Sequence, residues 1–380
     1  MAAASLTTGQ HVRRPPCWGL TPRPRPNSTT RSVAVRPCRP CCASKCPFAR
    51  PGEPSPLAAR GVQGAHASLW LSLGVPGQDT AGRLVSGLRR LRDPGEELLI
   101  ERAEEMPYEL GLKRRAYDDP ERHDKVFAAL PRSLPAQAEA LDLLLRHLPA
   151  RFPELYAVEG QGASRAVRVL PTGERHVVSQ YADAPLELAA RIVQEDLVLM
   201  ESGEEDGAPY VMTAAAVLCS FGGLDTKLGA PLGAIHVPVP GFEAELLDLV
   251  ERTFASLQPE RPLWRNNWGF SSSAELDNPK YGTAESQAVA AVAAVPPQGK
   301  MLKTEYQTLQ RLPETGAVLF TVRTMMEPLA GLGAVPGAAA VLAESLRRLS
   351  PGMHRYKGLD PAGAREMVEY VDQLAERAGR

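Results

Sequence analysis

The spacing of hydrophobic positions changes near Pro153. Before it, from 136 to 148, Leu141, Leu144 and Leu148 recur three and four positions apart, which predicts an amphipathic helix. After it, short apolar segments alternate with glycine-containing turns, a pattern that is typical of strands. The strands predicted in this part of the chain span 155–158, 166–170 and 176–180.

Longer apolar segments follow in the middle of the chain. The pattern from 185 to 200 predicts a helix, although its apolar end at 197–200 also fits a strand. Residues 210–221 form a nearly continuous apolar run, which indicates a central strand. A helix is expected from 241 to 258, because acidic residues in its first turn complement the helix dipole.

The last third of the chain predicts two further strands and two further helices. The strands are expected within 261–271 and 316–324. Between them, the Ala-, Val- and Pro-rich segment 284–298 has low complexity, and we interpret it as a loop or lid. The helices are expected at 338–349 and 361–378, the second with Asp360 as its N-cap residue and Pro361 in its first position.

Strands that cluster along the chain and are joined by hairpin-length links favour an antiparallel sheet over regular βαβ alternation. We therefore predict an α+β fold, with an antiparallel sheet, flanking helices packed on one side, and a single main domain at 106–378. Residues 61–105 are interpreted as a junction, with a basic helix at 80–92.

Residues 1–60 differ from the rest of the chain in charge. They hold ten basic residues and one acidic residue, Glu53, and they are rich in Ser, Thr, Ala and Pro. This composition is typical of an organellar transit peptide, and it favours the chloroplast over the mitochondrion. The alternative is a disordered tail without a targeting role.

The remaining residues carry 33 basic and 43 acidic side chains, a net charge of −10. Nucleic-acid binding generally requires a basic face, so this balance argues against it and fits a soluble protein. No apolar run approaches the length of a transmembrane helix, and no membrane span is predicted.

Five of the six cysteines lie within 1–60, and their spacing lacks the paired C-x-x-C knuckles of a zinc site. Removal of that segment would leave Cys219 alone, which excludes an internal disulfide and a four-thiolate cluster. Because Cys219 lies in an apolar run, we interpret it as a core residue rather than a thiolate ligand.

One histidine, His236, lies within an apolar run that is stiffened by Pro238 and Pro240. The residues before it, 232–235, are interpreted as a short buried strand. A neutral imidazole on a rigid apolar segment suits an axial ligand of haem. A core histidine without a ligand is the alternative interpretation.

Motifs for other cofactors are absent from the sequence. Gly331-Leu-Gly333 lacks the third glycine of a dinucleotide fingerprint, and there is no Walker loop, nucleophile elbow or H-E-x-x-H. The chain therefore has no recognisable flavin, nicotinamide or iron–sulfur site, and a redox reaction would need electrons from a partner.

Several stretches between 106 and 360 stand out together. They are Met106-Pro-Tyr-Glu-Leu-Gly-Leu112, Gln194-Glu-Asp-Leu-Val-Leu199, Phe221-Gly-Gly-Leu-Asp-Thr-Lys-Leu-Gly229, Pro231-Leu-Gly-Ala-Ile-His-Val-Pro-Val-Pro240, Arg265-Asn-Asn-Trp268, Gln307-Thr-Leu-Gln-Arg-Leu-Pro-Glu-Thr-Gly316 and Arg355-Tyr-Lys-Gly358. In this order they resemble the haem-dependent oxidative N-demethylase family, whose large subunit has a haem-binding PAS-like domain. The segment 284–298 looks like an insertion, and the leader departs from the bacterial members.

This resemblance implies a monooxygenase-like oxidoreductase that binds haem b without a covalent link, with His236 as the ligand of the iron. Arg265 and Arg323 would then pair with the haem propionates, and Asn267 and Trp268 would line the distal pocket as catalytic residues. A small methylated amine would be the substrate. Electrons would come from a flavin and iron–sulfur reductase or a ferredoxin-type donor. Assembly of the chain into an oligomer is compatible with the sequence.

Plainer interpretations stay open at each of these positions. The arginines also fit ordinary ion pairs at strand ends, and Trp268 also fits the core. Glu305 and Arg311 are expected to have structural roles, and His354 and Lys357 to lie at the surface, although the match around Lys357 would also let it cover a propionate. The whole domain also fits a non-catalytic haem-binding PAS-like sensor, or a small-molecule binding module that has lost haem.

Overall fold

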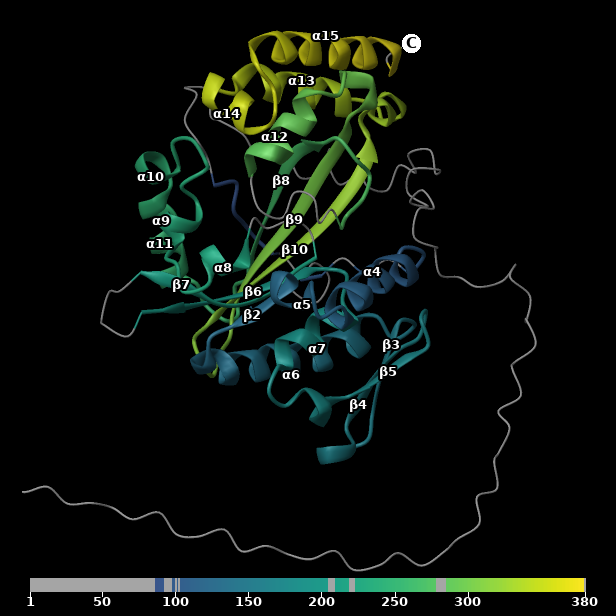
Figure 1. Cartoon of the computed structure of the whole chain (residues 1–380), viewed down its shortest axis with the longest axis vertical. Helices are drawn as coiled ribbons and strands as arrows, with labels where there is room; N and C mark the ends of the chain where they lie inside the picture. Colours follow the sequence, from purple (N-terminus) through teal and green to yellow (C-terminus); the bar gives the residue numbers. More distant parts are fainter. Residues whose placement is uncertain are drawn as a thin grey trace, which may run out of the picture. The chain divides into compact units, whose positions relative to one another are not determined.

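The computed structural model describes residues 86–91, 98–99, 101, 103–203, 209–218, 223–277 and 285–378 (Figure 1). All of them belong to one compact unit, Pro47–Arg380. The predicted transit segment with its five cysteines lies outside the described residues, and so does Cys219. Among the described residues, none of the helices combines the length and the hydrophobicity that a membrane span requires.

A seven-stranded antiparallel sheet forms the centre of the described fold, in the order β1-β8-β9-β10-β6-β7-β2 (Figure 1). Its strands are β1 (Arg89–Arg90), β2 (Phe127–Ala129), β6 (Asp196–Ser202), β7 (Tyr210–Ala216), β8 (Leu263–Ser271), β9 (Met301–Arg311) and β10 (Val318–Pro328). The hairpin of β9 and β10 pairs along the full length of both strands. The predicted α+β fold with an antiparallel sheet is confirmed.

Alternation along the strands gives this sheet two faces with different partners. On β10, Leu319 belongs to one apolar cluster, and Val318 belongs to another. On β6, Leu197 and Val198 divide in the same way. A side chain on this sheet therefore reaches one of two separate environments, depending on its place in the alternation.

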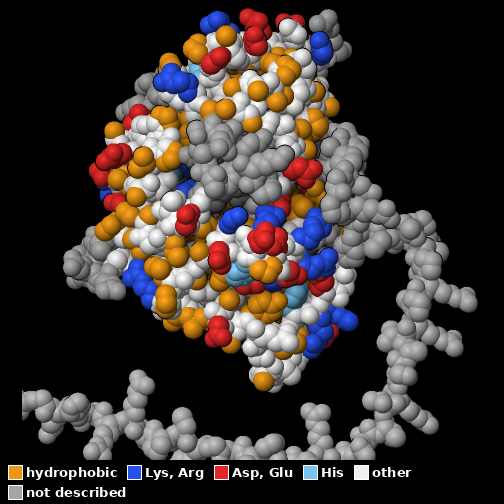
Figure 2. All heavy atoms as spheres, viewed as in Figure 1, with side chains coloured by type: hydrophobic (Ala, Val, Ile, Leu, Met, Phe, Trp, Pro, Cys, Tyr) orange, Lys and Arg blue, Asp and Glu red, His pale blue; other side chains and the backbone are white. Residues whose placement is uncertain are grey.

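The first face is covered by helices from the first half of the chain (Figure 1). They are α4 (Met106–Asp118), α5 (His123–Val126), α6 (Leu134–Arg151) and α7 (Pro185–Ile192). A small antiparallel sheet adjoins them, built from β3 (Tyr156–Glu159), β4 (Ala166–Val169) and β5 (Glu174–Val177). Acidic and basic side chains lie intermixed in the lower half of the surface seen in Figure 2.

Short helices cover part of the second face, so helices lie on both sides of the sheet rather than on one as expected. They are α8 (Leu224–Lys227), α9 (Leu232–Ile235), α10 (Phe242–Glu245) and α11 (Leu247–Ser256). A third group packs at one end of β8 to β10 (Figure 1). It comprises α12 (Glu285–Ala293), α13 (Ala338–Arg348), α14 (Pro351–Tyr356) and α15 (Pro361–Ala378).

Short 3₁₀ helices connect several of these elements. They are η1 (Pro131–Ser133), η2 (Gly162–Ser164), η3 (Val178–Tyr181), η5 (Pro297–Gly299) and η6 (Leu329–Ala334). The start of α15 follows its predicted capping, because the side chain of Asp360 accepts a hydrogen bond of 2.7 Å from the amide of Gly363.

The segment 185–200 divides into a helix and a strand. Helix α7 ends at Ile192, and β6 begins at Asp196, so the helix is shorter than predicted. Residues 196–200 are buried because the strand lies between β10 and β7. A strand buried on both faces has a continuous apolar pattern, which a helix can share.

The prediction of a loop or lid at 284–298 is wrong over most of its length. Residues 285–293 form α12, in keeping with the high helix propensity of alanine. The ammonium of Lys300 donates to the carbonyl oxygens of Val292 and Val295 and so caps the end of this helix. A methyl group on Gly358, which has φ +76°, would lie 2.7 Å from Val292. The helix therefore packs tightly against the turn that follows α14.

Two other expectations differ from the structure. Residues 232–235 form the single helical turn α9 rather than a strand, and the amide of His236 donates back to Leu232 at 3.2 Å. Within the expected helix at 80–92, Arg89–Arg90 instead form the edge strand β1 beside β8. Leu98 and Leu99 are buried, so parts of the predicted junction contribute to the core.

Candidate functional site

A cavity of about 110 Å³ lies between the second face of the sheet and helices α9 to α11. Its wall is apolar except for His236, Arg265 and Gln307. The lining residues are Leu88, Val198, Met200, Met212, Leu232, Ile235, His236, Phe242, Val250, Phe254, Arg265, Gln307, Leu309 and Phe320. An imidazole and a guanidinium thus share one hydrophobic space.

His236 is held in one orientation by its own helical turn. It directly follows α9, and its Nδ1 lies 2.8 Å from the carbonyl oxygen of Leu232. A carbonyl oxygen only accepts, so Nδ1 must carry the proton and donate it. The Nε2 lone pair is then free to bind a ligand, and within the described residues it has no hydrogen-bond partner.

Packing keeps this imidazole neutral. The ring stacks on Phe242, with ring centres 4.2 Å apart and planes 10° from parallel. Burial lowers the pKa of His236 to about 4; the bond to Leu232 opposes this shift, and the charges of Arg265 and Lys227 add to it. At neutral pH the side chain is therefore an uncharged base.

Arg265 lies on β8 and is held by amide and carbonyl groups rather than by carboxylates. Its Nε donates to the side-chain oxygen of Gln307 at 2.7 Å, and its Nη1 donates to the carbonyl of Ser86 at 3.2 Å. No ion pair of Arg265 is found among the described residues. Burial lowers the pKa of the guanidinium, and Glu305 and Tyr356 oppose this shift.

A polar row continues along the same face of β8 and β9. Glu305 accepts hydrogen bonds from Gln307 at 2.9 Å and from Asn267 at 3.1 Å, and it pairs with Lys303 at 2.7 Å. Burial alone would raise the pKa of Glu305, but Lys303, the hydrogen bond from Asn267 and the charge of Arg265 lower it to about 2. The predicted residue Asn267 thus lies near Arg265 but outside the cavity wall.

The comparison with known families gives a match over most of the chain. Residues 95–366, well over half of the chain, match the family described as haem-dependent oxidative N-demethylase, alpha subunit-like. The chain belongs to this family. Its name indicates dependence on haem, and the designation as an alpha subunit implies a partner subunit.

The cavity offers the donor set that the family's haem needs. A neutral imidazole with a free nitrogen suits an axial ligand, the walls are apolar, and a guanidinium suits a propionate. The volume of about 110 Å³ is smaller than the roughly 300 Å³ at which small-molecule pockets usually begin. A porphyrin therefore requires side chains of this wall to move, or it extends beyond the enclosed part.

Two of the predicted site residues lie elsewhere. Trp268 is buried in the apolar cluster beside α13 to α15, so the structure gives it the core position that the sequence left open. Arg323 is 1% exposed and lies in the alternation opposite Phe320, on the other face of the sheet. Its guanidinium pairs with Glu105 and Glu109, each at 2.7 Å, which is the ordinary ion-pair alternative.

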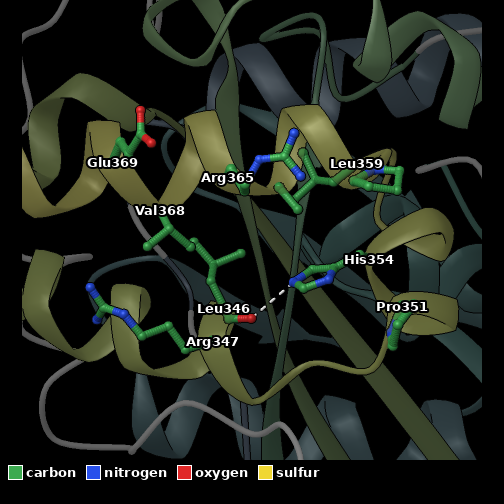
Figure 3. Close-up of a pocket in the computed structure, with 10 residues that line it drawn as sticks. Leu346, Arg347, Pro351, His354, Leu359, Arg365, Val368 and Glu369 are labelled. Atoms are coloured by element: carbon green, nitrogen blue, oxygen red, sulfur yellow. Dashed lines mark hydrogen bonds between the residues drawn. The ribbon is translucent and has the colours of Figure 1, made fainter.

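A larger cavity of about 410 Å³ lies among α13, α14 and α15 (Figure 3). Its histidine, His354, is engaged through Nε2 with the carbonyl of Leu346 at 2.9 Å (Figure 3). Arg347 at its edge is paired with Asp372. Its histidine is therefore held by the protein through the nitrogen that donates to Leu346, and size alone does not make this cavity the better site for the family's haem.

Sequence reasoning missed the importance of Phe242, Gln307 and Lys357. Phe242 supplies the stacking ring, and Gln307 anchors Arg265. Lys357 was expected at the surface, but its ammonium lies 4.1 Å from the ring centre of Trp268 and donates to the Trp268 carbonyl at 2.5 Å. Gln307 and Lys357 fall within the stretches that resemble the family, which was the available signal.

Proposed function

We propose that this chain is the haem-b-binding subunit of an oxidative N-demethylase and that His236 is the axial ligand. The observation that carries the proposal is the hydrogen bond of 2.8 Å between Nδ1 of His236 and the carbonyl of Leu232. It fixes the tautomer that leaves Nε2 free and makes the ring a stronger donor. Membership of the family supports the same group.

Other residues of the cavity would hold and shield the group. Arg265, without a carboxylate partner among the described residues, would pair with a propionate. Met200, Met212 and Phe320 are among the apolar side chains that would cover the macrocycle and exclude water. The stacking of Phe242 on His236 would resist tilting of the ligand.

Bound haem would supply the activation of dioxygen needed to oxidise an N-methyl group, which leaves as formaldehyde. The substrate would be a small methylated amine. Two electrons would come from a partner, a flavin and iron–sulfur reductase or a ferredoxin-type donor, and the implied partner subunit is consistent with this. Asn267, outside the wall, would act by holding Glu305 in the polar row.

The test is haem reconstitution of the full chain, beside His236→Ala and the matched control His354→Ala. We expect a one-to-one Soret band in the wild type and in the control and its loss in His236→Ala, with circular dichroism showing that all three are folded. A folded His236→Ala protein that keeps full haem occupancy would overturn the ligand assignment.

Turnover distinguishes the enzyme from a haem-binding sensor. The reconstituted protein is incubated with dimethylamine, dioxygen and a ferredoxin with its reductase, and formaldehyde is measured. Release that requires both the amine and the electron source supports the demethylase. A spectral response to the amine without formaldehyde would favour the sensor.

A further inference from the structure

Two half-buried cations near the cavity lack an ion-pair partner among the described residues. Arg265 is bonded to an amide and a carbonyl oxygen. Lys357 is bonded to the carbonyl of Trp268 and lies over that residue's ring. Each arrangement orients a positive charge without neutralising it, and removing such a charge from water is unfavourable unless an anion compensates.

Lys357 reaches the strand that carries Arg265, because the carbonyl oxygen it binds belongs to Trp268, three positions after Arg265 on β8. The start of the short helix α14 also packs against the segment after His236, since a methyl group on Gly352 would lie 3.2 Å from the side chain of Pro240. Val239 packs against the cluster that contains Met353 of α14. The turn that carries Lys357 is therefore tied to the segment that carries His236.

Positive side chains outnumber carboxylates in the region around Arg265 and Lys357. Arg265, Lys303 and Lys357 act on one another and on a single carboxylate, Glu305. Burial lowers the pKa of Lys357 to about 7; Glu305 opposes this shift, and Lys303 and Arg265 add to it. Since Lys303 is already paired with Glu305, the surplus positive charge belongs to Arg265 and Lys357.

We infer that Arg265 and Lys357 together form a binding site for carboxylates on an apolar molecule. Arg265 faces the hydrophobic cavity, so an anion that it binds can place an apolar body there. The carboxylates would come either from the propionate side chains of haem or from a free organic acid. The first source rests on the proposed function, and the second does not.

The first experiment compares binding of haem with binding of its dimethyl ester, in which both carboxylates are masked. We expect the wild type to bind haem at least about tenfold more tightly than the ester. A factor of this size corresponds to the loss of one hydrogen bond between charged groups. Lys357→Met should lose most of this preference for haem over its ester, and Lys357→Arg should retain it. The matched control is Lys125→Met, which should also retain the preference because Lys125 is exposed on α5. Circular dichroism shows whether each variant is folded.

The second experiment uses the haem-free protein. Lysines are reductively methylated with a ¹³C label, the Lys357 signal is identified by its absence from Lys357→Met, and sodium propionate is added. We expect propionate to raise the pKa read from this signal in the wild type and to leave it unchanged in Arg265→Met. The Lys125 signal should not respond.

Together the outcomes separate the inference from the proposed function. If haem and its ester bind equally and propionate leaves the Lys357 signal unchanged, the carboxylate site is overturned while haem binding stands. If haem does not bind but propionate shifts the signal, the site takes a free acid and the proposed function fails. Ester discrimination that is lost in Lys357→Met supports both.

Discussion

Arg323 and Arg265 are two poorly exposed arginines of one sheet, on opposite faces. Arg323 pairs with Glu105 and Glu109, and although burial would lower the pKa of its guanidinium, the surrounding carboxylates raise it. Arg265 has an amide and a carbonyl as partners, and burial lowers its pKa. The difference separates a charge that carboxylates of the fold neutralise from one without an ion-pair partner among the described residues.

The largest expected effect comes from removing each arginine in turn. Arg323→Met leaves buried carboxylates unpaired and should lower the free energy of unfolding by about 3–5 kcal/mol. Arg265→Met removes a charge without an ion-pair partner among the described residues, together with its hydrogen bonds to Gln307 and Ser86, and should lower it by only about 1–2 kcal/mol in the haem-free protein. Urea denaturation measures both, and equal losses would contradict the distinction between the two faces.

A smaller effect should appear in the pH dependence. Burial lowers the pKa of His236 from 6.5 to about 4, so across this window the unfolded chain takes up a proton that the folded chain does not. The stabilising contribution is therefore complete above pH 6.5 and is lost as the pH falls to about 4. Over the whole window we expect this group to lower the free energy of unfolding by about 1–3 kcal/mol. The upper limit is set by about 1.4 kcal/mol for each pH unit between the two pKa values.

Two other histidines also make the protein less stable as the pH falls, because burial lowers the pKa of His147 and of His176. The informative quantity is therefore the difference in unfolding free energy between the wild type and His236→Gln, measured from pH 7 to pH 4. A difference that stays constant over this range would show that His236 takes up its proton normally in the folded state.

The smallest effect concerns the anchor of Arg265. Gln307→Leu removes the acceptor of the Nε hydrogen bond and should cost about 1 kcal/mol of stability. Haem affinity should fall as well, because the guanidinium loses its fixed orientation. Denaturation and haem titration on the same samples measure both quantities, and Gln310→Leu, a neighbour on β9, is the comparison variant.

Much of the fold follows from local patterns. The leucine spacing of α6 and the capping residues of α15 predicted helices that the structure confirms. Strand β9 was not predicted; Lys303, Glu305 and Gln307 place polar groups on one of its faces. They are polar because that face carries the row of hydrogen bonds leading to Arg265. These hydrogen bonds join residues far apart in the sequence, so they depend on the tertiary fold and not on a local pattern.

The candidate site was predictable in part. The apolar, proline-rich context singled out His236, but Arg323 was grouped with Arg265 although alternation along its strand sets it opposite Phe320. What the sequence could not supply was the identity of the partners on each face. Glu105 and Glu109 lie more than 200 positions before Arg323, and no local pattern connects them.

The close packing of Gly358 against Val292 has a consequence for the evolution and engineering of this chain. Helix α12 belongs to a segment that looks like an addition to the family's pattern, yet it supports the turn that carries Lys357. Changes of length or composition in the added segment would therefore shift the reach of a lysine more than 60 positions away. On the proposal that Lys357 binds a carboxylate, such a change would alter ligand selectivity without replacing any residue that touches the ligand.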